Sequence, residues 1–150
     1  MWTISSRPCS RISRQGPWKE RSFKAMSRLR RTLIYRLPVI AYCGFIFWQS
    51  SSASFGSLPT FAFSDKIMHL GGYGLLGVLV FRVLAQESLP LSRKHLILAA
   101  IVFSTLFGVS DEIHQGFVAE RCADVFDAVA DLLGSTLGVL FYAKIKGQQE

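Results

Sequence analysis

The chain has 150 residues, of which 50% are hydrophobic, 13% aromatic and only 18% charged. A soluble domain has about 25% charged residues, so this composition excludes a disordered chain and argues against a small soluble enzyme. The formal net charge is +7, but no basic face interleaved with aromatic side chains accompanies it, so we expect no nucleic-acid partner. The composition therefore predicts an all-α integral membrane protein.

Residues 1–32 form a polar, basic segment that precedes the apolar part of the chain. The segment holds nine Lys and Arg residues against the single acid Glu20, includes Pro8, Gly16 and Pro17, and has no sustained apolar face. We predict a flexible basic cytoplasmic tail over residues 1–32, able to contact anionic lipid, with Met26 as a second candidate start.

Four apolar runs follow the tail, over residues 33–48, 66–84, 95–109 and 124–145. About 20 helical residues cross a bilayer. Runs two and four meet that length, run one is slightly short, and run three meets it only if the helix continues through residues 111–115. We predict a polytopic bundle of four transmembrane helices over residues 33–146. An alternative makes run one a signal peptide that is cleaved near residues 51–53.

The charges separate between the two ends of these runs. Of the 17 Lys and Arg residues, all but Lys66 and Arg121 fall in the tail or at the run ends that share its side. Most acids fall at the opposite ends. The positive-inside rule then places both termini in the cytoplasm.

Unusual polar residues gather where three runs meet the outer leaflet. The start of run two carries Asp65, Lys66, His69 and Tyr73; the end of run three carries Asp111, Glu112, His114 and Gln115; and Arg121, Asp124, Asp127 and Asp131 mark the start of run four. Spacings of three and four residues place side chains on one face of a helix. We therefore expect these groups to converge on one site.

Two interpretations of this convergence stay open. Ionisable groups at the centre of a membrane cost about 2.5–3.5 kcal/mol each, which favours a functional role. We predict His114 with Asp111 and Glu112 as a general acid–base group, and the other residues as ligand-binding. Helix capping and packing is the alternative, above all for Asp65 and Asp124. The chain has no His-x-x-x-His or Glu-x-x-His pair, so we expect no metal and no cofactor.

Small residues predict how the helices approach one another. Run four contains Gly134 and Gly138 four residues apart, and run two contains Gly71, Gly72, Gly74 and Gly77 just after His69. A small residue at every fourth position lets two membrane helices pack closely. We predict that runs two and four pack tightly and align their polar ends.

Three ordered motifs within residues 38–142 resemble the VanZ-like family of small bacterial membrane proteins. The motifs are Asp65-Lys66-Ile67-Met68-His69 with Tyr73, Asp111-Glu112-Ile113-His114-Gln115 with Phe117, and Arg121, Asp124, Asp127, Asp131, Gly134 and Gly138. The chain departs from the family at Ala119-Glu120, where Pro-Gly is usual, and at Cys122, where Ser or Thr is usual. The resemblance implies a multi-helix bundle and a role in the cell envelope, and the family is named for a protein associated with teicoplanin resistance.

We therefore expect a membrane protein that binds or modifies a membrane lipid or a lipid-linked envelope precursor. A membrane hydrolase or transferase at the same residues is one alternative. A structural protein with a protein partner is another. A proton-coupled transporter is disfavoured because the polar groups stay at one end of the helices rather than at the midplane.

Overall fold

The computed structural model describes residues 17–52, 64–87, 89–118 and 123–148 of the chain. Within these ranges every regular element is helical. The elements are α1 (Pro17–Arg31), the π-helical turn η1 (Thr32–Arg36), α2 (Leu37–Ser50), α3 (Ser64–Gln86), α4 (Arg93–Gln115) and α5 (Val125–Gly147). The prediction of an all-α fold is confirmed for these residues.

Helices α3, α4 and α5 are long and apolar enough to cross a membrane. Each has 23 residues, and at 1.5 Å per residue each is about 34 Å long, slightly more than the hydrocarbon core of a bilayer. Large apolar side chains such as Leu98, Leu106, Leu137 and Phe141 are exposed along them. Water disfavours such a surface and lipid favours it, so the chain is a multi-pass membrane protein.

The first apolar run differs from the other three. Helix α2 has only 14 residues, which is about 21 Å, and a fourth transmembrane helix stays a prediction. The π-helical turn lies immediately before Pro38, which occupies the first turn of α2. Proline has no N–H to donate, and its ring collides with the carbonyl of residue i−4, so a wider turn accommodates it.

The prediction of a flexible tail over residues 1–32 is wrong for Pro17–Arg31, which forms α1. Pro17 suits the first position of a helix, where no N–H donor is needed. The Arg, Lys, Glu, Met, Leu and Ala residues that follow are strong helix formers. Ala25, Met26 and Leu29 also share one face of α1, so the segment has a short apolar stripe that the sequence interpretation missed. Residues 1–16 lie outside the described ranges.

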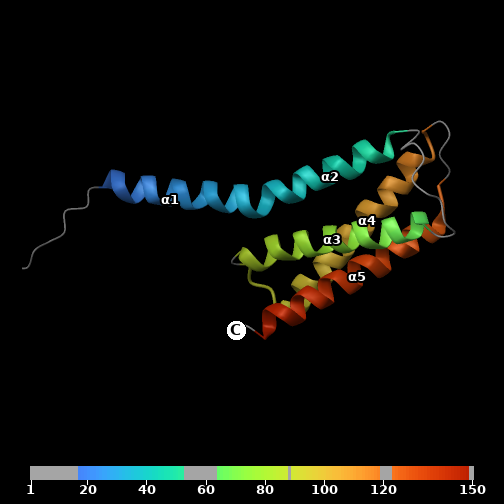
Figure 1. The fold of residues 1–150 in the computed structure, drawn as a ribbon. Coiled ribbons are helices and arrows are strands. Elements are labelled where there is room, and N and C mark those ends of the chain that lie inside the picture. The colour runs from blue at the N-terminus through green and yellow to red at the C-terminus, as the bar shows by residue number, and fades with distance from the viewer. Residues whose placement is uncertain (1–16, 53–63, 88, 119–122, 149–150) are drawn as a thin grey trace, which may run out of the picture.

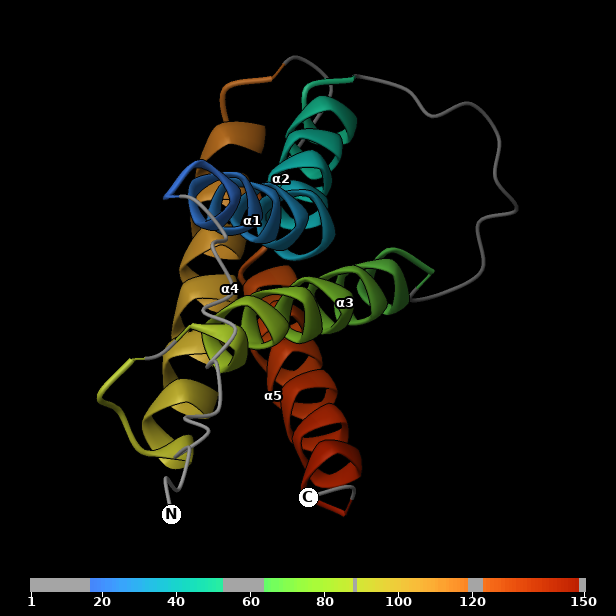
Figure 2. The same ribbon diagram turned by 90° about the vertical axis from the view of Figure 1, so that its left-hand side faces the viewer.

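The helices form two parts, as Figure 1 shows: α1, η1 and α2 make one long rod, which lies over the group of α3, α4 and α5. Helix α3 crosses α4 and α5 obliquely, and α1 projects past the group (Figures 1 and 2). The ion pair from Arg36 to Glu87, at 2.5 Å, and the hydrogen bond from the Tyr42 hydroxyl to the Gly72 carbonyl, at 3.2 Å, join the rod to the group.

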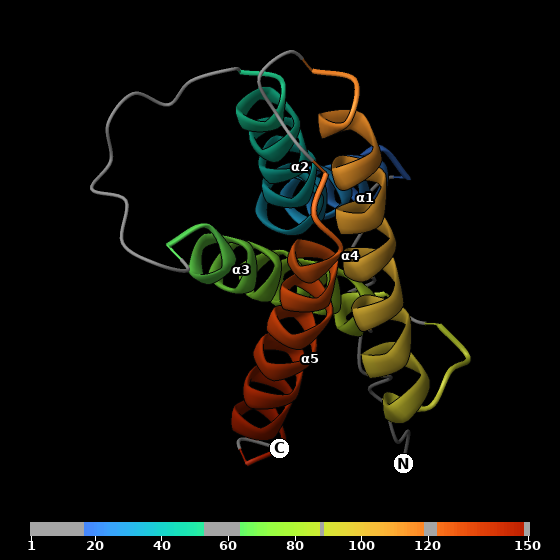
Figure 3. The same ribbon diagram turned by 90° about the vertical axis from the view of Figure 1, so that its right-hand side faces the viewer.

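The start of α3, the end of α4 and the start of α5 meet at one end of this group, which we call the polar end (Figures 1 and 3). The basic last turns of α1 and α5 lie away from it. Within the described ranges most acidic residues therefore lie at the polar end and most basic residues lie away from it, as the sequence predicts.

Glycines allow the backbones of α3 and α5 to come into direct contact. A Cβ atom at Gly134 would collide with the backbone of Leu70, and one at Gly138 would collide with the backbone of Gly74. The Ser135 hydroxyl donates a hydrogen bond of 3.4 Å to the Tyr73 carbonyl in the same contact. The predicted tight packing of runs two and four is confirmed, because only small residues allow backbones to approach this closely.

We expect Gly134→Ala to lower the free energy of unfolding by about 1–3 kcal/mol, because the new methyl group must displace the α3 backbone. Thermal unfolding of the detergent-solubilised protein measures the effect. The matched control is Gly71→Ala, since a Cβ atom there has no neighbour within 4 Å. Equal stability of the two variants would contradict the close contact between α3 and α5.

Candidate functional site

Seven polar side chains meet at the polar end, and we call them the polar cluster. They are Lys66 and His69 of α3, Asp111 and Glu112 of α4, Asp124 before α5, and Asp127 and Asp131 of α5. Four of them, Asp111, Glu112, Asp127 and Asp131, are buried. Three helices that are far apart in sequence therefore supply one group of mostly acidic side chains.

Lys66 connects the start of α3 to the start of α5 through two ion pairs. Its Nζ atom lies 2.6 Å from Oδ2 of Asp124 and 2.9 Å from Oδ1 of Asp127. Asp124 is also the N-cap of α5, because its Oδ1 accepts a hydrogen bond of 2.9 Å from the Phe126 N–H. The backbone N–H of Asp124 in turn donates to Oε2 of Glu112 at 3.0 Å. These contacts connect the start of α3, the end of α4 and the start of α5 to one another.

The Lys66 ammonium group keeps the pKa of Asp124 below its usual value, and the hydrogen bond from the Phe126 N–H adds to this effect. Both contacts stabilise the ionised carboxylate. Asp124 therefore stays charged at neutral pH. It caps α5, as the sequence suggests, and it also forms an ion pair with Lys66.

His69 lies at the centre of the polar cluster. Its Nδ1 atom is 2.9 Å from Oδ1 of Asp131, and its Nε2 atom is 3.7 Å from Oε1 of Glu112. Which of the two groups donates in the contact between His69 and Asp131 depends on the protonation of both, and Nε2 of His69 faces Glu112. The Tyr73 ring stacks on the imidazole with centroids 6.0 Å apart.

Asp131 is the most deeply buried member of the cluster, with 0% of its surface exposed. It lies against Gly108 of α4, where a Cβ atom would collide with its carboxylate. Its Oδ2 atom has no hydrogen-bond partner among the described residues. A charged group at such a position is costly unless other groups compensate for its charge.

The described part of the cluster has an excess of negative charge. It contains five carboxyl groups and one fixed cation, Lys66, with His69 as a further group that can become positive. Arg121, which the sequence predicts as a second cation, lies outside the described residues. Bound cations or protons would offset the remaining charge.

The structure separates the predicted acid–base group. Asp111 is buried and accepts a hydrogen bond of 3.2 Å from Gln115. His114 instead contacts the end of α2: its Nε2 atom is 3.0 Å from Oγ of Ser51, and its ring stacks on Phe47 at 4.6 Å. The Ser51 hydroxyl also donates to the Phe47 carbonyl at 2.8 Å, so His114 fastens α2 to α4 in this arrangement.

The remaining predicted residues divide between core and surface. Tyr73 is part of the buried core, whereas Asp65 is exposed and lies in the first turn of α3, one residue inside the helix rather than at its cap. The sequence interpretation missed Gly108 and Ser51. Gly108 precedes Asp111 by one helical turn, and that spacing is the only sequence signal for its place beside the cluster.

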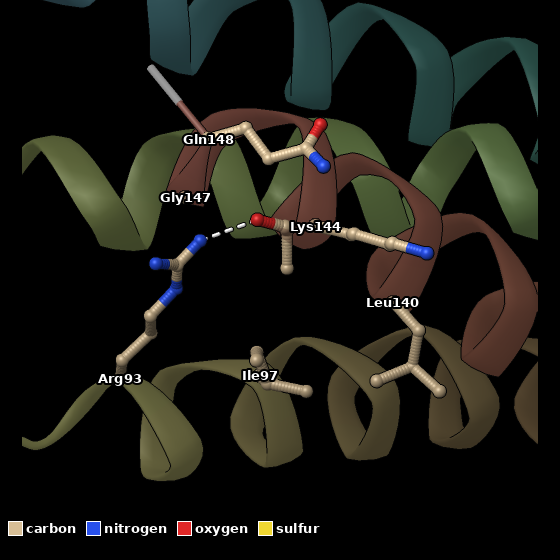
Figure 4. A pocket seen from close by; sticks show the side chains of 7 residues that line it. Arg93, Ile97, Leu140, Lys144, Gly147 and Gln148 are labelled. Carbon is tan, nitrogen blue, oxygen red and sulfur yellow. Dashed lines mark hydrogen bonds between the residues drawn. The ribbon is translucent and has the colours of Figure 1, made fainter. Parts of the chain in front are cut away.

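The opposite end of the bundle has a shallow hollow lined by Arg93, Ile97, Leu140, Lys144 and Gln148, which Figure 4 shows. The Arg93 guanidinium donates a hydrogen bond to the Ala143 carbonyl in the last turn of α5. A cation at this position satisfies a carbonyl at a helix C-terminus. We therefore interpret Arg93, which lines the hollow, as a residue that caps the C-terminus of α5.

The fold and the polar cluster define a multi-pass helical membrane protein with buried ionisable groups at one end. The sequence model of the family described as VanZ/LLP1 matches residues 12–146. The chain belongs to the VanZ/LLP1 family, as the three motifs predict. The comparisons found no match to a curated protein or to a solved structure.

We expect the ion pair of Lys66 to make stability depend on pH. Asp124→Asn keeps a capping oxygen but loses the negative charge, so the variant should unfold at a lower temperature than the wild type at neutral pH. Because the pKa of Asp124 is lowered in the folded state, this difference is present above the ordinary Asp pKa and disappears as the pH falls through the lowered value. Unfolding temperatures of both proteins from neutral pH to about pH 3 test this. A difference that stays constant over this range would contradict the ion pair.

Proposed function

We propose that the polar cluster binds the polar headgroup of a membrane lipid or of a lipid-linked precursor of the cell envelope. The observation that carries the proposal is the burial of four carboxyl groups at one end of three membrane-length helices, with Lys66 as their only fixed cation within the described residues. Hydroxyl and cationic groups of a headgroup are suitable partners for such carboxylates.

The cluster is open at its rim. The side chains of Lys66 and Asp124 are 29% and 39% exposed, whereas that of Asp127 just behind them is 8% exposed. A headgroup that approaches along the membrane boundary would meet the rim first and the buried carboxyl groups second. Such a site excludes water while it stays accessible from the lipid phase.

Apolar side chains surround the rim and suit the lipid tail. Ile67 and Met68 of α3 and Phe126, Val129 and Leu133 of α5 are all exposed. An acyl or prenyl chain that lies along α3 and α5 would cover this surface while its headgroup occupies the cluster. The exposed basic residues Arg28, Arg30 and Arg31 of α1 would bind anionic lipid at the other end of the helices.

The charge separation supports a topology as part of the proposal. The positive-inside rule places the basic end and both termini in the cytoplasm, and it places the polar cluster at the outer leaflet of a bacterial cytoplasmic membrane. The family resemblance adds a role in the cell envelope. Altered teicoplanin susceptibility would be a consequence of that role that has to be measured, because no contact among the described residues points to a glycopeptide.

A hydrolase or transferase that acts on the same lipid is the second candidate. The pair that favours it is His69 with Asp131, because their contact of 2.9 Å joins an imidazole to a buried carboxylate. A neighbouring carboxylate orients an imidazole for proton transfer. His114, which the sequence interpretation made the base, has its ring nitrogen against Ser51, and it would need a rearrangement of α2 to take part.

Mass spectrometry of lipids that co-purify with the protein from native membranes tests the binding function. We expect one defined lipid or precursor on the wild type, reduced roughly tenfold or more in Asp111→Asn/Asp124→Asn, since that change corresponds to a loss of about 1.4 kcal/mol of binding free energy. Asp65→Asn is the matched control, because Asp65 is exposed and makes no hydrogen bond or ion pair within the described residues.

Identical, ordinary phospholipids on the wild type and the folded double variant would contradict the proposal. Lower stability of the double variant without a change in bound lipid would instead support a structural role with a protein partner. Turnover of the identified lipid by the wild type, lost in His69→Gln but not in His114→Gln, would support the enzymatic candidate.

A further inference from the structure

Three side chains of the polar cluster have the arrangement of metal ligands. His69, Glu112 and Asp127 each offer one ligand atom, and these three atoms all lie within 4.8 Å of one another. The residues come from α3, α4 and α5 in turn. Two atoms that bind one zinc-sized ion lie roughly 3–3.5 Å apart at bond lengths of about 2.0–2.2 Å. The contact of 3.7 Å between Nε2 of His69 and Oε1 of Glu112 is close to this distance.

A buried carboxylate oxygen that no described residue hydrogen-bonds points into the same space. Glu112 is only 6% exposed, and its Oε1 atom has no hydrogen-bond partner among the described residues. The other oxygen, Oε2, accepts the Asp124 N–H and fixes the orientation of the carboxylate. A buried carboxylate oxygen without a partner is costly, and a metal ion beside it would remove that cost.

The surroundings of His69 match those of a metal-binding histidine. Such a histidine commonly donates its second ring N–H to a carboxylate, which fixes the tautomer and directs the other nitrogen at the metal. Oδ1 of Asp131 lies 2.9 Å from Nδ1 of His69, and Nε2 faces Glu112, which is the geometry that such a histidine requires. Asp131 is therefore a positioning residue for the proposed site.

Lys66 is compatible with this arrangement, although it contacts one of the ligands. It binds Oδ1 of Asp127, and a carboxylate has a second oxygen that can bind a metal ion. The ligand set of one imidazole and two carboxylates excludes a typical calcium or magnesium site, because those ions prefer oxygen ligands alone. It suits a first-row transition metal of the Zn²⁺ type, for which three protein ligands leave a further position open.

We propose that His69, Glu112 and Asp127 bind a divalent transition-metal ion of the Zn²⁺ type at the polar end of the bundle. The ion would offset the excess negative charge of the cluster. Its open position would accept an oxygen atom of a bound molecule, and the phosphate of a lipid headgroup is the suitable class, because carboxylates without the ion would repel it. That last step rests on the proposed lipid-binding function, whereas the metal site does not.

The test measures metal directly on the full chain in detergent. The protein is purified without a polyhistidine tag, treated with a chelator, loaded with Zn²⁺ and analysed by elemental mass spectrometry, while Co²⁺ serves as an absorbing probe in parallel. We expect about one ion per wild-type chain, as in other three-ligand zinc sites. Glu112→Gln should lose the ion, and the Co²⁺ absorption bands should disappear with it. The matched control Glu87→Gln, which only breaks the pair with Arg36, should bind as the wild type does.

Asp131→Asn separates positioning from ligation. It should weaken Zn²⁺ affinity roughly 10–100-fold while the stoichiometry at saturation stays unchanged. Wild-type protein that retains no Zn²⁺ after loading and gives no Co²⁺ bands would overturn the proposal, and this measurement needs no variant to fold. Equal retention of Zn²⁺ by Glu112→Gln and Glu87→Gln would also overturn it. Neither readout involves lipid, so failure here differs from failure of the lipid-binding function.

Discussion

The contact between the backbones of α3 and α5 determines where every other part of the site lies. At Gly74, Gly134 and Gly138 the two backbones approach without an intervening side chain, and any Cβ atom at Gly134 or Gly138 would enter the opposite backbone. Lipid offers no hydrophobic force to join helices, so van der Waals contact and hydrogen bonds must do so. Because the helices touch along this face, the first turn of α3 and the first turns of α5 meet at one end.

The polar cluster is the consequence of this contact. His69 follows Lys66 by one turn on α3, and Asp127 and Asp131 lie one turn apart on α5, so two rows of polar groups face each other. The pair of Lys66 with Asp127, at 2.9 Å, and the pair of His69 with Asp131, also at 2.9 Å, join these rows. Helix α4 adds Glu112, whose carboxylate bonds to the N-cap of α5.

The burial of so many ionisable side chains costs free energy in a membrane protein. A chain that needed only to pack could place apolar side chains at these positions, and replacement of buried ion pairs by apolar groups is often neutral or stabilising. Oε1 of Glu112 and Oδ2 of Asp131, which have no hydrogen-bond partner among the described residues, add to the cost. This is the physical reason for our proposals that the cluster binds a ligand and a metal ion.

The helix boundaries were largely predictable from the sequence. The lengths of the apolar runs predicted α3 and α5 to within a few residues, and the length needed to cross a bilayer correctly extended α4 through residues 111–115. Single-helix spacing also predicted which residues of one helix share a face, as for Lys66 and His69. The glycine pattern identified the α3–α5 contact, because the steric requirement is local to each helix.

Contacts between helices were only partly predictable. Spacing places His114 three residues after Asp111, but the position of α2 decides that His114 meets Ser51 and Phe47 rather than the cluster. Gly108 carries no chemistry of its own, and its role appears only once Asp131 lies against it. Helix α1 was missed because its short apolar stripe, which includes Ala25, Met26 and Leu29, lies among many basic residues.

A double-mutant cycle between His69 and Asp131 tests the central claim most directly. Unfolding free energies would be measured in one detergent for the wild type, His69→Gln, Asp131→Asn and the double variant. The close contact across α3 and α5 predicts a coupling energy of about 0.5–3 kcal/mol. Effects that add without coupling, in variants that remain folded, would show that the two side chains are not in contact and would contradict the arrangement of the polar cluster.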